Sequence, residues 1–181
     1  IHSGIDVGTT KIAVIIAEIV NESINILGFG ESNSEGLKRG IVVDVDKTSN
    51  AIEEAVTKAE KQAELEINSA FIGITGEHVK GINCSGTITI SNNEYMNPAG
   101  ERITKDDMKR VLESAEAINL PAQRKILHTL SRSFKVDDNP NIINPEGLSG
   151  HRLEANVHIV TIARNIETDL KTCLERVGIE F

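Results

Sequence analysis

The feature that most constrains the fold is a change of hydrophobic period within the first 76 residues. Three β-branched runs, separated by turn residues, lie at 3–7, 11–19 and 23–30. They predict an antiparallel meander of three short strands. From Thr48 to Ala63 the apolar residues instead recur at helical spacing, and we expect Asp46 or a neighbour to cap this helix. The apolar run at 70–75 predicts a buried strand, so this stretch indicates an α/β unit.

A second succession of strands and helices follows. We expect a strand pair or a bent strand at 80–91 and strands at 125–136 and 154–163, with polar loops at 92–102 and 137–150. One helix is expected to begin at the capping-box pattern Thr104-x-x-Asp107 and to stop before Pro121. Another helix, capped by Asn165 and ended by Gly178, precedes the start of a further strand at 179–181.

These elements divide the chain into two α/β units. We place the first at residues 1–77 and the second at residues 78–163, and we expect residues 164–181 to return to the first unit. The sequence contains no internal repeat and no low-complexity tract. The organisation is therefore one unit inserted into another.

Composition and charge disfavour several classes of protein. Aromatic residues make up only 3% of the chain and Trp is absent, which disfavours stacking of single-stranded nucleic acid on aromatic rings. The formal net charge of −8 also disfavours binding to a phosphate backbone. We therefore expect no nucleic-acid partner. No apolar run approaches the roughly 20 residues that span a bilayer.

The remaining polar clusters point to structural roles rather than to catalysis or metal binding. The two cysteines and five histidines have no paired spacing typical of metal ligands. We interpret Asp106–Asp107 as carboxylates at a helix start and Asp137–Asp138 as solvated loop residues. Arg152 and Glu154 are compatible with a cross-strand ion pair. Because no nucleophile elbow or triad is visible, we predict no catalytic residue.

One group of residues is a candidate binding site: the sequence IDVGTTK between the first two predicted strands. Gly8 lets the backbone approach a phosphate closely, and consecutive N–H groups of the turn can line an anion cradle. The hydroxyls of Thr9 and Thr10 and the ammonium of Lys11 add donors. Asp6, a carboxylate that ends an apolar strand and so calls for a partner, would hold the waters of a phosphate-bound Mg²⁺. The same sequence is also compatible with a plain hairpin that binds no ligand.

This succession of a strand, Asp-x-Gly-Thr-Thr and a second strand resembles the first phosphate motif of the actin-like ATPase superfamily, which includes actins, heat-shock chaperone ATPases and sugar kinases. Further stretches are similar to one family within it, the FtsA family of bacterial cell-division proteins. These stretches are Gly36–Val42, Ile126–His128 with Phe134–Asp137 and, most strongly, Asn144–Thr161. Together the resemblance covers essentially the whole chain. The sequence departs from the family pattern at Ser131-Arg132-Ser133, where a Pro-Gln pair is usual, and in a longer loop at 95–101.

The resemblance implies an α/β fold: an actin-like (ribonuclease H-like) core subdomain, incomplete in this chain, with a small inserted α+β subdomain at residues 78–163. It further implies that the intact protein binds ATP and Mg²⁺, with the turn residues 8–11 on the phosphates and Asp6 on the metal through water. The second phosphate motif and the adenosine motif would follow Phe181. We therefore expect an amino-terminal portion that binds ATP weakly or not at all, from a protein with at most weak ATPase activity.

By the same resemblance, the intact protein polymerises on the cytoplasmic face of the inner membrane, anchors the FtsZ ring and recruits later division proteins. Residues 78–163 would contact a neighbouring protomer and these partners. The region that binds FtsZ and a C-terminal amphipathic membrane helix would lie beyond this chain. We therefore expect a cytoplasmic protein that is peripheral on the membrane.

Two other functions stay open from the sequence. A sugar- or acetate-type kinase of the same superfamily would need a catalytic Asp and a substrate pocket in a second lobe. An actin-like pilus-assembly protein would be a pure interaction module, with a different inserted subdomain. Filament formation on lipid that depends on ATP would separate the cell-division reading from both.

Overall fold

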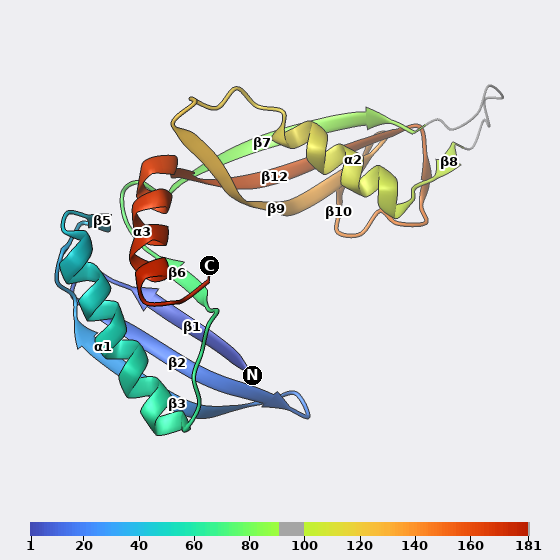
Figure 1. Ribbon diagram of the computed structural model, residues 1–181. Helices are drawn as coiled ribbons and strands as arrows, with labels where there is room; N and C mark the ends of the chain where they lie inside the picture. The colour runs from blue at the N-terminus through green and yellow to red at the C-terminus, as the bar shows by residue number, and fades with distance from the viewer. Residues whose placement is uncertain (91–99, 181) are drawn as a thin grey trace. The chain divides into compact units, whose positions relative to one another are not determined.

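A computed structural model describes residues 1–90 and 100–180 of the chain (Figure 1). The chain forms two compact units. Unit 1 contains Ile1–Val79 and Ala163–Phe181, and unit 2 contains Lys80–Ile162. Within the described part of the chain, none of the helices combines the length and the apolar character that a membrane span requires. The net charge is divided unequally, because unit 1 holds 17 acidic and 9 basic residues while unit 2 holds ten of each.

Unit 1 is built on a four-stranded sheet in the order β3-β2-β1-β6. Its strands are β1 (His2–Val7), β2 (Lys11–Val20), β3 (Ser23–Asn33) and β6 (Phe71–Ile74). The first three pair antiparallel, which confirms the predicted meander, whereas β6 runs parallel to β1. A separate two-stranded hairpin is formed by β4 (Leu37–Lys38) and β5 (Ile41–Val42).

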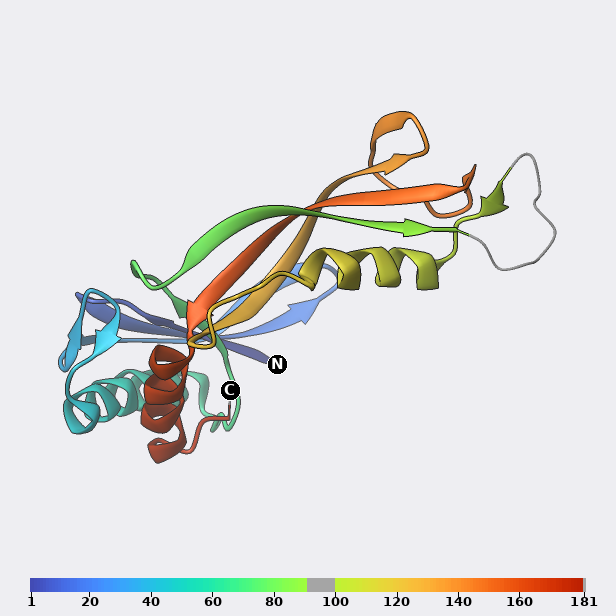
Figure 2. The ribbon, with the colours of Figure 1, turned by 90° about the horizontal axis from the view of Figure 1, so that it is seen from above.

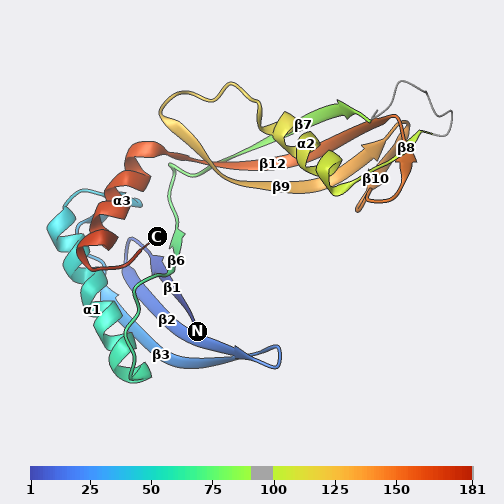
Figure 3. The ribbon, with the colours of Figure 1, turned by 45° about the vertical axis from the view of Figure 1, so that its right-hand side comes forward.

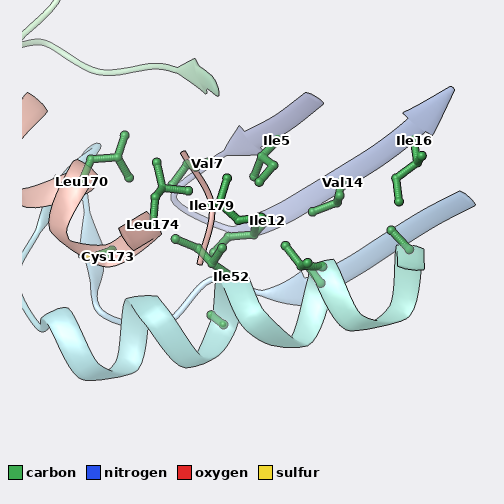
Figure 4. Packing of buried hydrophobic residues seen from close by; sticks show 14 residues of the cluster. Ile5, Val7, Ile12, Val14, Ile16, Ile52, Leu170, Cys173, Leu174 and Ile179 are labelled. Atoms are coloured by element: carbon green, nitrogen blue, oxygen red, sulfur yellow. The ribbon is translucent and has the colours of Figure 1, made fainter. Parts of the chain in front are cut away.

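Two helices, α1 (Val45–Ala63) and α3 (Arg164–Arg176), share one apolar core with this sheet. Figure 2 shows α1 lying along one face of the sheet, and Figure 4 shows the aliphatic side chains between them. The fully buried members of this core include Ile5, Ile12, Ile52 and Leu174. The alternation along β1 and β2 therefore sends every second side chain towards the helices.

The helix ends test the predicted caps. Asp44 caps α1 and accepts a hydrogen bond from Lys47 N at 3.1 Å, so a neighbour of Asp46 fills the role, as expected. The prediction for α3 is wrong, because the helix begins at Arg164 and its N-cap, Ala163, makes no side-chain hydrogen bond. The strand β12 (Arg152–Ala163) ends at the residue before the helix begins, so no residue is left between them for a polar cap (Figure 3).

The chain after α3 lies against the sheet of unit 1. Gly178 adopts a positive φ of 79° just after the helix. Glu180 then forms a parallel bridge with Ser69, next to β6, which confirms the start of a further strand. Phe181, the last residue of the predicted strand, lies outside the described residues.

Unit 2 contains a second four-stranded sheet, in the order β10-β9-β12-β7. Its other strands are β7 (Lys80–Thr89), β9 (Arg124–Val136) and β10 (Asn139–Ile142), and the short strands β8 (Glu101–Arg102) and β11 (Ser149–Gly150) pair separately. The predicted loop 137–150 thus contains β10 and β11, because its polar residues pair in turns and short ladders. Residues 92–99 of the other predicted loop lie outside the described residues.

The helix α2 (Lys105–Glu116) covers one face of this sheet and packs mainly on β7. The predicted capping box is confirmed, since the side chains of Thr104 and Asp107 each bond to the other's backbone N–H. Gly86 permits a close approach of the helix, because a Cβ there would lie 2.3 Å from Ala115 N. The helix ends at Glu116, before the expected stop at Pro121.

Candidate functional site

The turn between β1 and β2 contains most of the predicted site residues. Val7 pairs with Ile12, and Gly8 N donates a hydrogen bond of 3.1 Å to Lys11 O, which closes the turn. A Cβ on Gly8 would lie only 2.8 Å from Lys11 O, so the tight turn favours glycine at this position. Thr10 O accepts a bond of 3.0 Å from Ser34 N, which ties the turn to the end of β3.

The donors that remain for a ligand come from the two threonines. Thr9 and Thr10 are exposed, and among the residues that the structure describes none bonds to their N–H or hydroxyl groups. The N–H of Gly8 is used inside the turn. Gly8 therefore supplies the backbone conformation, while the amides and hydroxyls of Thr9 and Thr10 are free to bind an anion.

Asp6 lies on the face of the sheet opposite α1. Its neighbours Ile5 and Val7 are buried towards the helices, whereas Asp6 itself is exposed. The expectation that this carboxylate needs a partner to offset burial is not met, because solvent reaches it. A Cβ on Gly73 of the parallel strand β6 would lie 3.5 Å from Asp6 Oδ1. The glycine therefore leaves space beside the carboxylate for water or a ligand.

Lys11 is shared with an acidic residue of β3. Its Nζ lies 2.9 Å from Glu31 Oε2, and both side chains are about half exposed. The hydrogen bond to Glu31, followed by the charge of Glu31, raises the pKa of Lys11 above its ordinary value. The ammonium is therefore positive at neutral pH, but it must leave Glu31 or bridge from it to reach a phosphate.

The parallel pairing of β1 with β6 decides where this turn lies. The register places Val7 opposite Ile74, so the residues that follow the two strands meet at one edge of the sheet. Ligands of α/β sheets commonly bind at the carboxyl ends of parallel strands. The β4–β5 turn also reaches this edge, because a Cβ on Gly40 would lie 2.2 Å from Thr75 O. The position of Thr75 and Gly40 at this edge was not predicted from the sequence. The signal that could have indicated it is Gly76, the glycine that closes the strand.

Several of the other candidates from the sequence have structural partners. Arg152 and Glu154 form an ion pair of 3.2 Å, but along one strand rather than across two. His158 Nδ1 lies 2.8 Å from Asn83 Oδ1 on the neighbouring strand. Within residues 1–90 and 100–180, no cluster of three or more His, Cys, Asp or Glu side chains could hold a metal. Asp6 could therefore bind Mg²⁺ only with help from water and phosphate oxygens.

Two surface depressions lie where a ligand or partner could bind. One of about 350 Å³ lies beside the candidate site and is lined by Asp6, Ala13, Ile15, Phe71 and Gly73, among others. A larger one, of about 580 Å³, lies on unit 2 and is lined mainly by polar residues, including Asn83, Ser85, Ser133 and Asn156. The donor set of the β1–β2 turn fits a phosphate, and Asp6 fits a hydrated divalent cation.

Comparison with known proteins gives a consistent result. Residues 76–161 match the family model of the SHS2 domain inserted in FtsA. The chain is 37% identical over 178 residues to the cell division protein FtsA of Pseudomonas aeruginosa, covering 98% of this chain and 41% of that protein. It is 31% identical over 181 residues to FtsA of Bacillus subtilis, covering 100% of this chain and 40% of that protein. The chain thus spans about two fifths of the length of the curated relatives it matches.

A solved structure also resembles the chain. A chain of the PilM–PilN type IV pilus biogenesis complex superposes with a TM-score of 0.60, covering 98% of this chain and 45% of that chain. At 13% sequence identity this likeness is one of fold alone. Together with the inserted SHS2 domain, it confirms the predicted actin-like α/β core with an inserted subdomain.

Proposed function

Because the chain belongs to the FtsA family of cell division proteins, we propose that it provides one wall of an ATP site and a partner-binding subdomain in a protein of cell division. The observation that supports the ATP site is the β1–β2 turn. It presents the free donors of Thr9 and Thr10 at the carboxyl edge of a parallel strand pair, with the Asp6 carboxylate beside them.

Each residue of the turn has a distinct role in this proposal. The N–H and hydroxyl groups of Thr9 and Thr10 bind phosphate oxygens, and Gly8 holds the backbone in the required turn. Lys11 moves from Glu31 to neutralise phosphate charge. Asp6 binds a water ligand of Mg²⁺, which itself bridges the phosphates. Because unit 1 carries the whole net negative charge, these local donors must hold the anion against an unfavourable field.

Titration of the 181-residue chain with ATP and Mg²⁺ by NMR tests this site. We expect binding only in the millimolar range, because one wall of the site makes few contacts. The amide signals of Thr9 and Thr10 should move most and that of Gly8 less. The Lys11→Met variant should weaken binding about tenfold. Lys47→Met removes an exposed lysine of the same unit and should leave binding unchanged.

Two results would contradict this proposal. Micromolar affinity of the chain alone would show a complete site rather than one wall. Signal changes confined to residues outside the β1–β2 turn would move the site elsewhere. For the intact protein we propose at most weak ATPase activity. Experiments on it should therefore measure ATP binding first and ATP turnover second.

The proposed role of unit 2 is protein interaction. Residues 78–163 would contact a neighbouring protomer in a filament and later division proteins, while FtsZ and the membrane would bind through other regions of the intact protein. One observation supports such a role: among the described residues, no helix packs on the face of the unit 2 sheet opposite α2, and this face is rich in Asn, Ser and Thr. Electron microscopy of the intact protein on lipid monolayers at the composition of an inner membrane tests it. ATP-dependent filaments are expected, whereas a phosphorylated metabolite without filaments would favour a kinase.

A further inference from the structure

The outer edge of β3 is protected along only part of its length. β3 is an edge strand of the unit 1 sheet, and among residues 1–90 and 100–180 it pairs with β2 alone. From Phe29 onward, side chains of α1 bond to its outward backbone groups. Phe29 N donates to Gln62 Oε1 at 3.0 Å, and Lys58 Nζ donates to Glu31 O at 2.7 Å. In this part the helix takes the place of a further strand.

Residues 23–27, near the tip of the β2–β3 hairpin, have no such protection. Among the described residues, no side chain bonds to the outward backbone of this segment. The segment SINIL contains no charge and no proline, which are the usual devices that block edge pairing. Ile24 and Ile26 are 71% and 63% exposed, and on the paired strand Ile19 is 58% exposed. The hairpin thus presents an apolar, unpaired strand to solvent.

The segment is self-complementary about Asn25. If two copies pair antiparallel with Asn25 opposite its own counterpart, Ile24 of one copy faces Ile26 of the other, twice. Directly opposed β-branched side chains stabilise antiparallel pairs. The charged neighbours stay apart: Glu18, which accepts a hydrogen bond of 3.3 Å from Asn25 Nδ2, lies one strand further from the axis. A two-fold contact of this kind is closed and does not propagate.

We propose that two copies of the chain pair through residues 23–27 of β3, so that their unit 1 sheets join into one continuous sheet. The partner that fits this edge is a second copy, because the pattern is symmetric about one residue. The contact uses neither the β1–β2 turn nor unit 2, and it goes beyond the proposed function. It therefore forms without ATP and is independent of filament contacts.

We expect the dimer to be weak and to become stronger as the salt concentration rises. Five residues per strand bury much less surface than a standard interface, which indicates association in the micromolar to millimolar range. Each copy brings a unit 1 that has an excess of eight acidic residues. Since salt screens the repulsion between these units, raising the ionic strength should strengthen the dimer. A contact driven by opposite charges would weaken instead.

Sedimentation equilibrium of the 181-residue chain, over concentrations up to millimolar and without nucleotide, tests association. Ile24→Lys places a charge on the edge and should weaken the dimer at least tenfold. Ile143→Lys makes the same change at an isoleucine of unit 2 that is 89% exposed and should have no effect. Thermal unfolding of each variant shows whether the fold is kept. A strictly monomeric chain, or equal weakening by both variants, would overturn the proposal.

Cysteine cross-linking tests the register in a Cys84→Ser background, where the remaining Cys173 is buried. Directly opposed residues of an antiparallel pair have Cα atoms about 5 Å apart, within reach of a disulfide. Asn25→Cys should therefore form a disulfide dimer on mild oxidation. Glu22→Cys should not, because its two copies would lie about 20 Å apart along the strands. Equal cross-linking at both positions, or none at residue 25, would refute this register.

Discussion

The two sheets of the molecule are assembled by the same device but present different surfaces. In each, a helix packs against a glycine of an edge strand: a Cβ on Gly30 would lie 1.9 Å from Ala55 O, and one on Gly86 would lie 2.3 Å from Ala115 N. The faces opposite these helices differ. That of unit 1 exposes Ile15, Phe29 and Phe71, whereas that of unit 2 presents polar residues that include Asn83, Ser85, Asn156 and His158.

The sheets also differ in strand direction, and this difference locates the candidate site. Unit 1 contains the parallel pair β1–β6, so two strands end at the same edge, next to the β1–β2 turn. In unit 2, β7 and β10 pair antiparallel with their neighbours. Contacts of Arg124 with Thr161 and of Asp137 with Arg152 show that β9 and β12 are antiparallel too. Helix packing is thus common to both sheets, and the site follows from the parallel pair.

The largest expected effects come from the two packing glycines. Gly30→Ala and Gly86→Ala each force a Cβ into helix backbone, and we expect each to destabilise its own unit by about 3 kcal/mol or more. Hydrogen exchange measured across both units should show loss of protection confined to the mutated unit. Gly4→Ala is the control, since its Cβ would have 3.9 Å of clearance. Loss of protection in both units from one substitution would show that they unfold together.

The capping box of α2 comes next and acts on unit 2 alone. Asp107 is almost fully buried, accepts bonds of 2.9 Å and 2.7 Å from Thr104 N and Oγ1, and pairs with Arg110 at 3.0 Å. Asp107→Ala should cost about 2 kcal/mol in urea unfolding, because it leaves these groups without their partner. Asp106→Ala removes the adjacent, exposed carboxylate of the same first turn and should cost less than about 1 kcal/mol. Equal losses would assign the effect to helix charge instead.

A pH experiment sharpens the same contrast. Burial works to raise the pKa of Asp107, but the bonds from Thr104 and the pair with Arg110 outweigh it and hold the pKa below its ordinary value. The backbone N–H of His151 likewise lowers the pKa of Asp137. A carboxyl group whose pKa is lowered in the folded state stabilises the fold above about pH 4. This stabilisation is lost as the pH falls through the pKa of the folded state. Stability of unit 2 should therefore drop below pH 4, and Asp107→Asn should flatten that drop.

The smallest effect on stability is expected at the β1–β2 turn. Glu31→Gln removes the exposed pair with Lys11, which should leave the free energy of unfolding almost unchanged, because exposed ion pairs contribute little to stability. The pKa of Lys11 should fall, because the hydrogen bond and charge of Glu31 raise it. An NMR titration of the lysine side chain measures this change. A pKa that stays raised would show that another group, such as Asp6, holds the ammonium.

Much of the local structure could be predicted, for reasons that lie within short segments. The three-strand meander follows from alternating β-branched residues, and the capping box of α2 from Thr104 and Asp107 three residues apart. The predicted cap of α3 was wrong. Asn165 has a side chain suited to capping, but the preceding strand continues to Ala163 and the helix begins at the next residue. The β10 and β11 strands were missed, since two- to four-residue ladders in a polar loop leave no hydrophobic period to detect.

The site shows the same division. Asp6, Gly8, Thr9, Thr10 and Lys11 could be predicted as site residues because a glycine-containing turn between strands, with hydroxyl and charged neighbours, is recognisable within seven residues, and their role stays a prediction. The sequence could not reveal that Gly8 N–H closes the turn, that Asp6 is solvated above Gly73, or that Glu31 holds Lys11. Each of these depends on a partner in another strand.

What the amino-acid order established was therefore the kind of local element, the composition of the turn and the likeness to a family, all of which depend on neighbouring residues. The three-dimensional fold established the parallel pairing of β1 with β6, more than 60 residues apart, and the return of α3 to the same core. It also left one stretch of β3 without cover. These features arise from contacts between distant segments, and local propensity contains no information about which distant strand becomes a neighbour.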